Sequence, residues 1–163
     1  MPISHSDDNL LAVPGKYPAP LVIVHGCNCQ GVWGRGIAEQ LRIKYPDAYA
    51  DYHHYSRSKK PTDLRGTARL FEVSHQVYIG SLYTSIHYRI PDPRVEILEA
   101  TGLAVANLLQ QVKGLGLNAR YYSNKFNSGL FKVDWHYTED ALRKVLLDGR
   151  DVSWQVCTPP EHQ

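Results

Sequence analysis

The sequence predicts an α/β protein built as a three-layer α/β/α sandwich. Two observations lead to this fold class. Strand-like apolar segments alternate along the chain with segments of helical periodicity. In addition, 163 residues with 43% hydrophobic content suffice for one core but hardly for two. We therefore expect a single domain over residues 1–163, with irregular ends at about 1–8 and 158–163.

The alternation begins with a buried strand. Residues 21–24 are four consecutive apolar residues, and they run directly into a polar loop that is rich in glycine. Residues 36–46 then place apolar side chains at helical spacing until Pro46 interrupts the pattern. A second, short helical segment is expected over residues 48–56.

Paired strands and a long helix make up the centre of the chain. Residues 66–73 and 76–85 are predicted as consecutive strands that pair with each other. Residues 92–116 form the clearest helix, and its expected buried face carries Val95, Leu98, Gly102, Val105, Leu109 and Val112. The remaining elements are a strand at 118–123, a loop at 124–135, a helix at 138–147 opened by Thr138, and a last strand at 152–158.

Composition narrows the class of protein. No apolar run reaches the roughly 18 residues of a membrane span, and no secretory signal begins the chain, so we expect a cytoplasmic protein, with the nucleus as a second location. Three cysteines fit a reducing compartment better than a disulfide framework. The net charge of +2 is too small for a nucleic-acid coat. The basic cluster at 55–61 is interpreted as a solvated loop, with an anionic partner as the alternative.

The loop after the first strand, residues 25–36, is the leading candidate for a binding site. Ligands of open α/β sheets bind beyond the carboxyl ends of the strands, and the start of a helix offers N–H groups to an anion. Gly31, Gly34 and Gly36 match neither the dinucleotide fingerprint nor the NTPase phosphate loop. A phosphate-binding loop and close strand–helix packing are therefore both open for these glycines.

His25, Cys27 and Cys29 form a second candidate set. Alternate residues of an extended strand point to the same side, and three such ligands would suit zinc. A fourth ligand at a conventional spacing is missing, and nothing nearby in the sequence lowers the pKa of a thiol. Buried packing is therefore favoured over a zinc site or a cysteine nucleophile, and we expect neither a metal nor a cofactor. His53 and His54 are interpreted as surface or packing residues.

Two motifs resemble those of the macrodomain family. Residues 22–52, VIVHGCNCQGVWGRGIAEQLRIKYPDAYADY, are similar to the first loop and helix of a macrodomain. More narrowly, they resemble the fungal ADP-ribose 1''-phosphate phosphatase branch, with its pattern His-x-Cys-Asn-Cys-x-Gly-x-Trp-Gly-x-Gly-Ile-Ala. Residues 126–135, FNSGLFKVDW, are similar to that branch's Asn-Ser-Gly-Ile-Phe-Gly-Val-x-Trp. The resemblance covers most of the chain and implies a macrodomain-like sandwich with a mixed central sheet.

The resemblance also implies which residues form the site. It makes His25 and Asn28 the catalytic residues, with Asn28 in contact with the distal ribose. The substrate-binding residues that it implies in the first motif are Gly26, Cys27, Trp33, Gly34, Arg35, Gly36, Ile37 and Ala38. Those of the second motif, where successive N–H groups form an anion-binding concavity, are Asn127, Ser128, Gly129, Leu130 and Phe131. Asp8 or Asn9 matches the position that binds the adenine amino group.

The implied reaction is hydrolysis of ADP-ribose 1''-phosphate to ADP-ribose and inorganic phosphate without a metal. In this hypothesis His25 activates a water or acts as the nucleophile, and the alternative is that it only forms a hydrogen bond within the strand end. A lysine-adduct mechanism is not expected, because the middle loop reads YTSIHYR and the last loop has Phe131. Arg35 either contacts phosphate or stays an exposed loop residue.

Two other functions are kept as alternatives. One is a binding module for ADP-ribose without catalysis, and the other is a hydrolase that removes mono-ADP-ribose from acidic residues of proteins. The expected partners are accordingly small ADP-ribose derivatives, or mono-ADP-ribosylated proteins in the third case. Neither a membrane nor direct binding of nucleic acid is expected.

Overall fold

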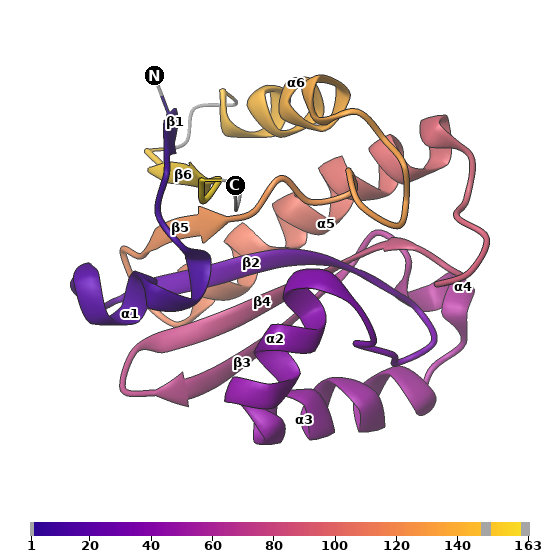
Figure 1. Ribbon diagram of the computed structural model, residues 1–163, viewed down its shortest axis with the longest axis horizontal. Helices are drawn as coiled ribbons and strands as arrows, with labels where there is room; N and C mark the ends of the chain where they lie inside the picture. Colours follow the sequence, from indigo (N-terminus) through magenta and orange to yellow (C-terminus); the bar gives the residue numbers. More distant parts are fainter. Residues whose placement is uncertain (1, 148–150, 161–163) are drawn as a thin grey trace.

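The fold is a sheet covered by helices on both faces (Figure 1). A computed structural model describes residues 2–147 and 151–160. In chain order the elements are β1 (Ile3–Ser6), η1 (Leu10–Ala12), α1 (Val13–Lys16), β2 (Leu21–Asn28), α2 (Gly36–Lys44), α3 (Pro46–Arg57), α4 (Pro61–Leu64), β3 (Ala68–Ser74), β4 (Val77–Ser85), α5 (Arg94–Gly114), β5 (Arg120–Ser123), α6 (Trp135–Leu146) and β6 (Trp154–Cys157).

The described strands form one mixed sheet in the order β1-β6-β5-β2-β4-β3. Neighbouring strands are parallel throughout the series β1-β6-β5-β2-β4, whereas β3 runs antiparallel to β4. The central strand β2 is an apolar run because both of its faces are covered. Val22 and Val24 belong to the core under α5 and α6, and Leu21 and Ile23 to the core under α2 and α3. These two cores confirm the predicted three-layer sandwich.

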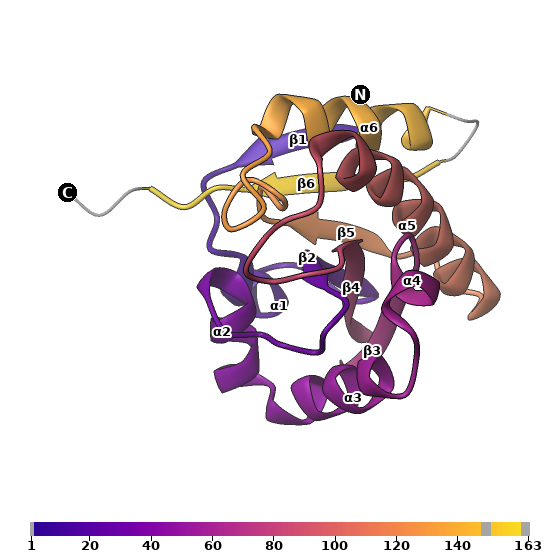
Figure 2. The same ribbon diagram turned by 90° about the vertical axis from the view of Figure 1, so that its right-hand side faces the viewer.

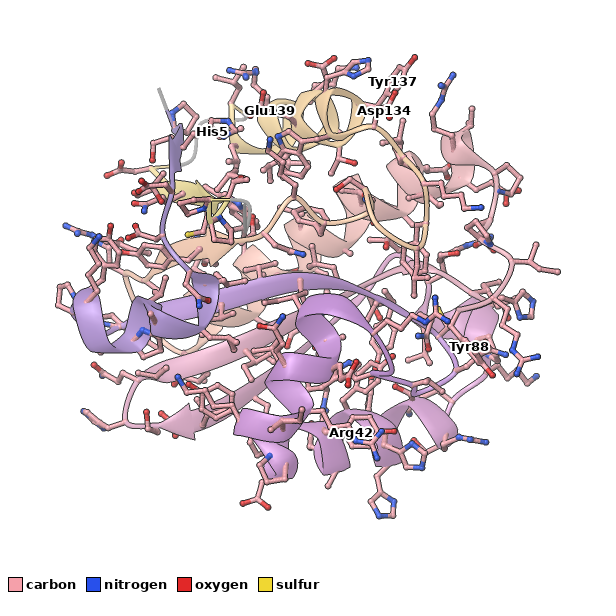
Figure 3. The ribbon with its side chains drawn as sticks, in the orientation of Figure 1. His5, Arg42, Tyr88, Asp134, Tyr137 and Glu139 are labelled. Carbon is pink, nitrogen blue, oxygen red and sulfur yellow. The ribbon has the colours of Figure 1, made fainter. Side chains whose placement is uncertain are left out.

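The amino-terminal segment corrects the expectation of an irregular end over residues 1–8. Ile3–Ser6 is the edge strand β1, which pairs with β6, and the Ile3 side chain is buried. His5 Nε2 lies 2.5 Å from Glu139 Oε1 and so joins β1 to α6 (Figure 3). The strand escaped prediction because three of its four residues are polar, so no apolar alternation marks it.

The long helix α5 corrects the predicted phase of the buried face. Val105 and Val112 are buried as predicted, but Val95 is 72% exposed. Ile97 and Ala100 take the buried side of the first turns instead. The large apolar residues alone misplaced this face, because small residues such as Ala100 also line the contact with the sheet. None of the described helices has both the length and the apolar character needed to cross a lipid bilayer.

The loops that follow β2, β4 and β5 emerge side by side. These three strands are parallel neighbours in the sheet, so their carboxyl ends meet at one edge. The loops lie together at the right-hand end of the molecule in Figure 1 and face the viewer in Figure 2. We refer to residues 29–35 as loop A, residues 86–93 as loop B and residues 124–134 as loop C. The candidate site lies at this edge.

Candidate functional site

A cleft of about 670 Å³ opens between loops A, B and C, a volume within the range of small-molecule sites. It brings together Asn28 and nearly all the expected substrate-binding residues of both motifs, namely Gly26, Cys27, Trp33, Gly34, Arg35, Gly36, Ile37, Ala38, Asn127, Gly129, Leu130 and Phe131. Ser128 does not line the cleft, and its hydroxyl instead donates to the carbonyl of Lys125. The cleft thus joins two motifs that lie about a hundred residues apart in the sequence.

Sequence reasoning missed Tyr88 and Arg89 of loop B and Asn124 and Lys125 of loop C, which also line the cleft. No spacing or motif marks these four residues. One signal was available for loop B, because it follows a strand that neighbours β2, and the loops at the carboxyl ends of such strands form the ligand site.

Asn28 shapes loop A as well as lining the cleft. Its Oδ1 accepts hydrogen bonds from the backbone N–H groups of Gln30 (3.0 Å) and Val32 (3.2 Å), and its Nδ2 donates to the Val32 carbonyl at 2.7 Å. The Tyr52 hydroxyl donates to the Asn28 carbonyl at 2.6 Å. One amide side chain therefore closes the loop onto the end of β2, as side-chain amides do in turns.

The start of α2 forms the wall of the cleft after loop A. Arg35 is extended and caps the helix, and Gly36 takes a φ of 60°, which glycine adopts without strain. The first N–H groups of a helix have no partner within it and carry a partial positive charge. Trp33 anchors the loop by stacking on Tyr52 with ring centroids 4.9 Å apart. An anionic group in the cleft would therefore meet backbone donors held on a buried support.

Asn127 fastens loop C to three other elements. Its Oδ1 accepts a hydrogen bond from Thr84 of β4 at 2.7 Å, and its Nδ2 donates to Thr101 of α5 at 3.0 Å and to Thr138 of α6 at 3.4 Å. Its φ of 70° is a left-handed conformation that asparagine tolerates better than most residues. Thr138 was expected to open the last helix, but α6 already begins at Trp135, so Thr138 lies within the helix and its hydroxyl takes part in this buried contact.

Gly26 lets loop C approach the central strand. A Cβ atom at this position would lie 3.1 Å from Asn127 Oδ1 and 3.4 Å from Thr84 Oγ1, which is tighter than most contacts of real side chains. The absence of a side chain at Gly26 therefore allows loops A and C to converge over the end of β2.

His25 lies beneath the cleft and does not line it. The ring is fully buried, its Nε2 lies 2.8 Å from Ser81 Oγ, and its edge packs against Trp33. Burial lowers the pKa of the imidazole to about 3, so the ring is neutral at physiological pH. This geometry does not support direct activation of a water by His25, and it favours the alternative of a hydrogen bond within the strand end.

The three cysteines are buried thiols. Burial raises the pKa of Cys27, and it raises the pKa of Cys29 to about 12 and that of Cys157 to a lesser extent. These thiols therefore stay protonated and act as small apolar groups, as the packing interpretation expected. Within the described residues, no three His, Cys, Asp or Glu side chains are placed to hold a metal ion.

Asp8 and Asn9 lie outside the cleft lining. The carboxylate of Asp8 accepts hydrogen bonds from Lys16, from Tyr17 (2.6 Å) and from Gln155 (2.9 Å), and the contact with Lys16 is the main cause that lowers its pKa to about 2. Asn9 Oδ1 accepts from the N–H of Leu11 and caps η1. The structure thus places neither side chain in the cleft, where adenine recognition was expected of one of them.

The charge of the cleft has one sign. Arg35, Arg89 and Lys125 line it, whereas no carboxylate of residues 2–147 or 151–160 does. Within the part of the chain that the structure describes, none of these three cations forms an ion pair with a carboxylate. A cleft lined by one sign of charge attracts ligands of the opposite sign.

Known proteins are similar to this chain over most of its length. No protein-family model matches the chain. The ADP-ribose 1''-phosphate phosphatase of Scheffersomyces stipitis is 34% identical over 165 residues, which cover 86% of this chain and 92% of that protein. The enzyme of the same name from Aspergillus oryzae is 30% identical, with 80% and 85% covered. Among solved structures, the macrodomain of Mycobacterium tuberculosis DarG shares the fold at a TM-score of 0.76 and 21% identity, covering 98% of each chain.

Proposed function

Because the chain belongs to the family of macrodomain-type ADP-ribose 1''-phosphate phosphatases, we infer that it hydrolyses the terminal phosphate of ADP-ribose 1''-phosphate. The products are ADP-ribose and inorganic phosphate. The observation that carries this inference is the cleft itself, which joins both sequence motifs and, among the residues that the structure describes, is lined by cations and by no carboxylate. Such a lining suits a ligand that bears a diphosphate and a further phosphate.

The two motifs suggest where the diphosphate lies. Residues at the start of α2 and in loop C line the cleft, and the backbone N–H groups of helix starts and of such loops bind phosphate oxygens without side-chain charge. The resemblance places the distal ribose next to Asn28, at the end of β2. We therefore propose that the diphosphate lies between α2 and loop C, with the distal ribose over Asn28.

The chemistry follows from alignment and charge. A water oxygen bonds to the terminal phosphorus, the bond from phosphorus to the sugar oxygen breaks, and that oxygen keeps the electron pair and takes a proton. Phosphoryl transfer of this kind passes through a loose transition state and depends mainly on positioning and electrostatic stabilisation. Neither a histidine nor a carboxylate lines the described cleft, so the cations and backbone donors supply the main assistance.

The function is tested by a time course of phosphate release from ADP-ribose 1''-phosphate in the presence of a chelator. Release of phosphate at a rate proportional to enzyme is expected. Binding of ADP-ribose without phosphate release would instead identify a binding module. A parallel assay uses a protein that carries mono-ADP-ribose on a glutamate. It detects a hydrolase that removes mono-ADP-ribose from proteins, because that reaction yields ADP-ribose and no phosphate.

The His25→Gln variant is expected to keep kcat within about threefold of the wild-type value at pH 7, because a glutamine can replace the hydrogen bond to Ser81. Loss of a general base would instead cost about 10²- to 10⁴-fold. If kcat falls by that much in a variant that unfolds at the same urea concentration as the wild type, His25 takes part in the reaction.

The same substitution is expected to flatten the pH dependence of stability. The unfolded chain binds a proton at His25 near pH 6.5, whereas the folded imidazole, with its pKa of about 3, does not. The wild-type free energy of unfolding therefore falls as the pH drops from 7 to 4, by up to about 1.4 kcal/mol per pH unit from this residue. Urea unfolding at pH 7, 6, 5 and 4 measures this slope in both proteins, and equal slopes would contradict the assignment.

A further inference from the structure

We propose that Arg89 in loop B recognises the terminal phosphate and thereby sets the preference for ADP-ribose 1''-phosphate over ADP-ribose. This inference rests on the proposed function. It concerns a residue outside both sequence motifs, in a loop that lines the cleft.

The strand order places loop B beside the far end of the ligand. Strand β2 lies between β5 and β4, so loop C and loop B flank it on opposite sides. Asn28, at the end of β2, is in register with Ser85 of β4, after which loop B begins. With the diphosphate between α2 and loop C, a sugar over Asn28 points its far substituent toward loop B. Figure 3 shows Tyr88 of this loop at the same end of the molecule as loops A and C.

Loop B is held in place by contacts with its neighbours. Gln30 Oε1 of loop A accepts a hydrogen bond from the N–H of Tyr88 at 3.0 Å. Asp92 Oδ2 accepts from the N–H of Ile86 at 3.1 Å and from the Arg65 guanidinium at 3.1 Å. The backbone that carries Arg89 is therefore fixed relative to loop A, and little conformational entropy is lost when the loop meets a ligand.

The chemistry of Arg89 fits a phosphate monoester. Its guanidinium carbon lies 5.6 Å from the centre of the Tyr88 ring, and among the described residues it forms no ion pair. A guanidinium donates two parallel hydrogen bonds to two phosphate oxygens. ADP-ribose has only a hydroxyl group at this position. An arginine here therefore binds ADP-ribose 1''-phosphate more tightly than ADP-ribose.

The other cations of the cleft lie near the part that both ligands share. Arg35 directly precedes α2 and Lys125 belongs to loop C, so both flank the expected position of the diphosphate. Removal of either charge weakens the binding of ADP-ribose 1''-phosphate and of ADP-ribose by the same factor, so the ratio of the two affinities is unchanged. Of the three cations, Arg89 alone is placed to discriminate between them.

The test compares Arg89→Gln with Arg35→Gln and with a control, Arg120→Gln. Arg120 is also an exposed arginine, but it lies at the amino-terminal end of β5, opposite the end of the sheet at which the cleft opens. Phosphate release from ADP-ribose 1''-phosphate gives kcat and KM, and calorimetry gives the Kd of ADP-ribose. For Arg89→Gln we expect kcat/KM to fall about 10- to 100-fold while the Kd of ADP-ribose changes less than about twofold. We expect Arg35→Gln to weaken both ligands and Arg120→Gln to weaken neither.

Each failure has its own signature. If the wild-type protein releases phosphate and Arg89→Gln does so with an unchanged kcat/KM, the assignment of Arg89 is wrong. Equal losses for both ligands in Arg89→Gln would overturn its role in specificity. If the wild-type protein releases no phosphate, the proposed function fails, and the Kd values of the two ligands for the wild type and Arg89→Gln still decide whether Arg89 binds the terminal phosphate.

Discussion

Asn127→Ala is expected to lower the free energy of unfolding by about 2–4 kcal/mol and the affinity for ADP-ribose at least about tenfold. The substitution leaves the buried hydroxyl groups of Thr84, Thr101 and Thr138 without their shared partner. It also places alanine at a φ of 70°, which costs about 1 kcal/mol more than glycine there. Loop C then loses its attachment to the sheet and to both helices behind it. Urea unfolding and calorimetry with ADP-ribose measure the two effects.

Two control variants separate the causes. Asn127→Gly removes the same hydrogen bonds but accepts the left-handed backbone, so it should be slightly more stable than Asn127→Ala. Ser128→Ala changes the exposed neighbouring residue and should alter stability by less than about 0.5 kcal/mol. If Asn127→Ala were as stable as Ser128→Ala, the buried network would not hold loop C.

Asn28→Ala is expected to lower kcat/KM for phosphate release about 100-fold. The variant loses the three hydrogen bonds that close loop A through Gln30 and Val32. The wall formed by loop A and the start of α2 then moves relative to loop C, and a displacement of about 1 Å is enough for such a loss. Steady-state phosphate release with ADP-ribose 1''-phosphate measures the effect.

Asn118→Ala provides the matched control for this prediction. Asn118 is an exposed asparagine just before the amino-terminal end of β5, and the cleft lies at the carboxyl ends of the strands. Its replacement should therefore leave kcat/KM unchanged. A kcat/KM of Asn28→Ala within about threefold of that control would show that loop A keeps its shape without this side chain.

The centre of the fold and the two motif loops could be predicted from the sequence. The apolar run at 21–24 identifies a strand buried on both faces, and the glycines after it identify a loop at its carboxyl end. Gly26 and Asn127 were expected in one site, and they lie so close that a Cβ atom added to Gly26 would be only 3.1 Å from Oδ1 of Asn127. Local patterns sufficed here because each motif resembles a known one, the first at the end of β2 and the second in the loop that follows β5.

Other parts could not be predicted because their cause is not local. The four residues of β1 show no alternation, since an edge strand is defined by its partner β6. Arg89 lies in the site only because β4 is a neighbour of β2. His25 was expected in the cleft, although it shares the strand face of Leu21 and Ile23, which pack under α2 and α3. Its ring packs against Trp33 of loop A, a contact that the sequence alone does not reveal.

The parallel pairing of β1 with β6 also dictates when the protein can fold. Ile3 lies beside Trp154 and Ser6 beside Cys157, so two strands pair although almost all of the described chain lies between them. Strand β1 therefore stays without this partner until β6 has been synthesised, and the β1 side of the sheet cannot form before then. Such distant pairings slow folding and prolong the exposure of strand edges. Until β6 is available, β1 and the adjacent side of β5 present unpaired strand edges on which another chain can pair.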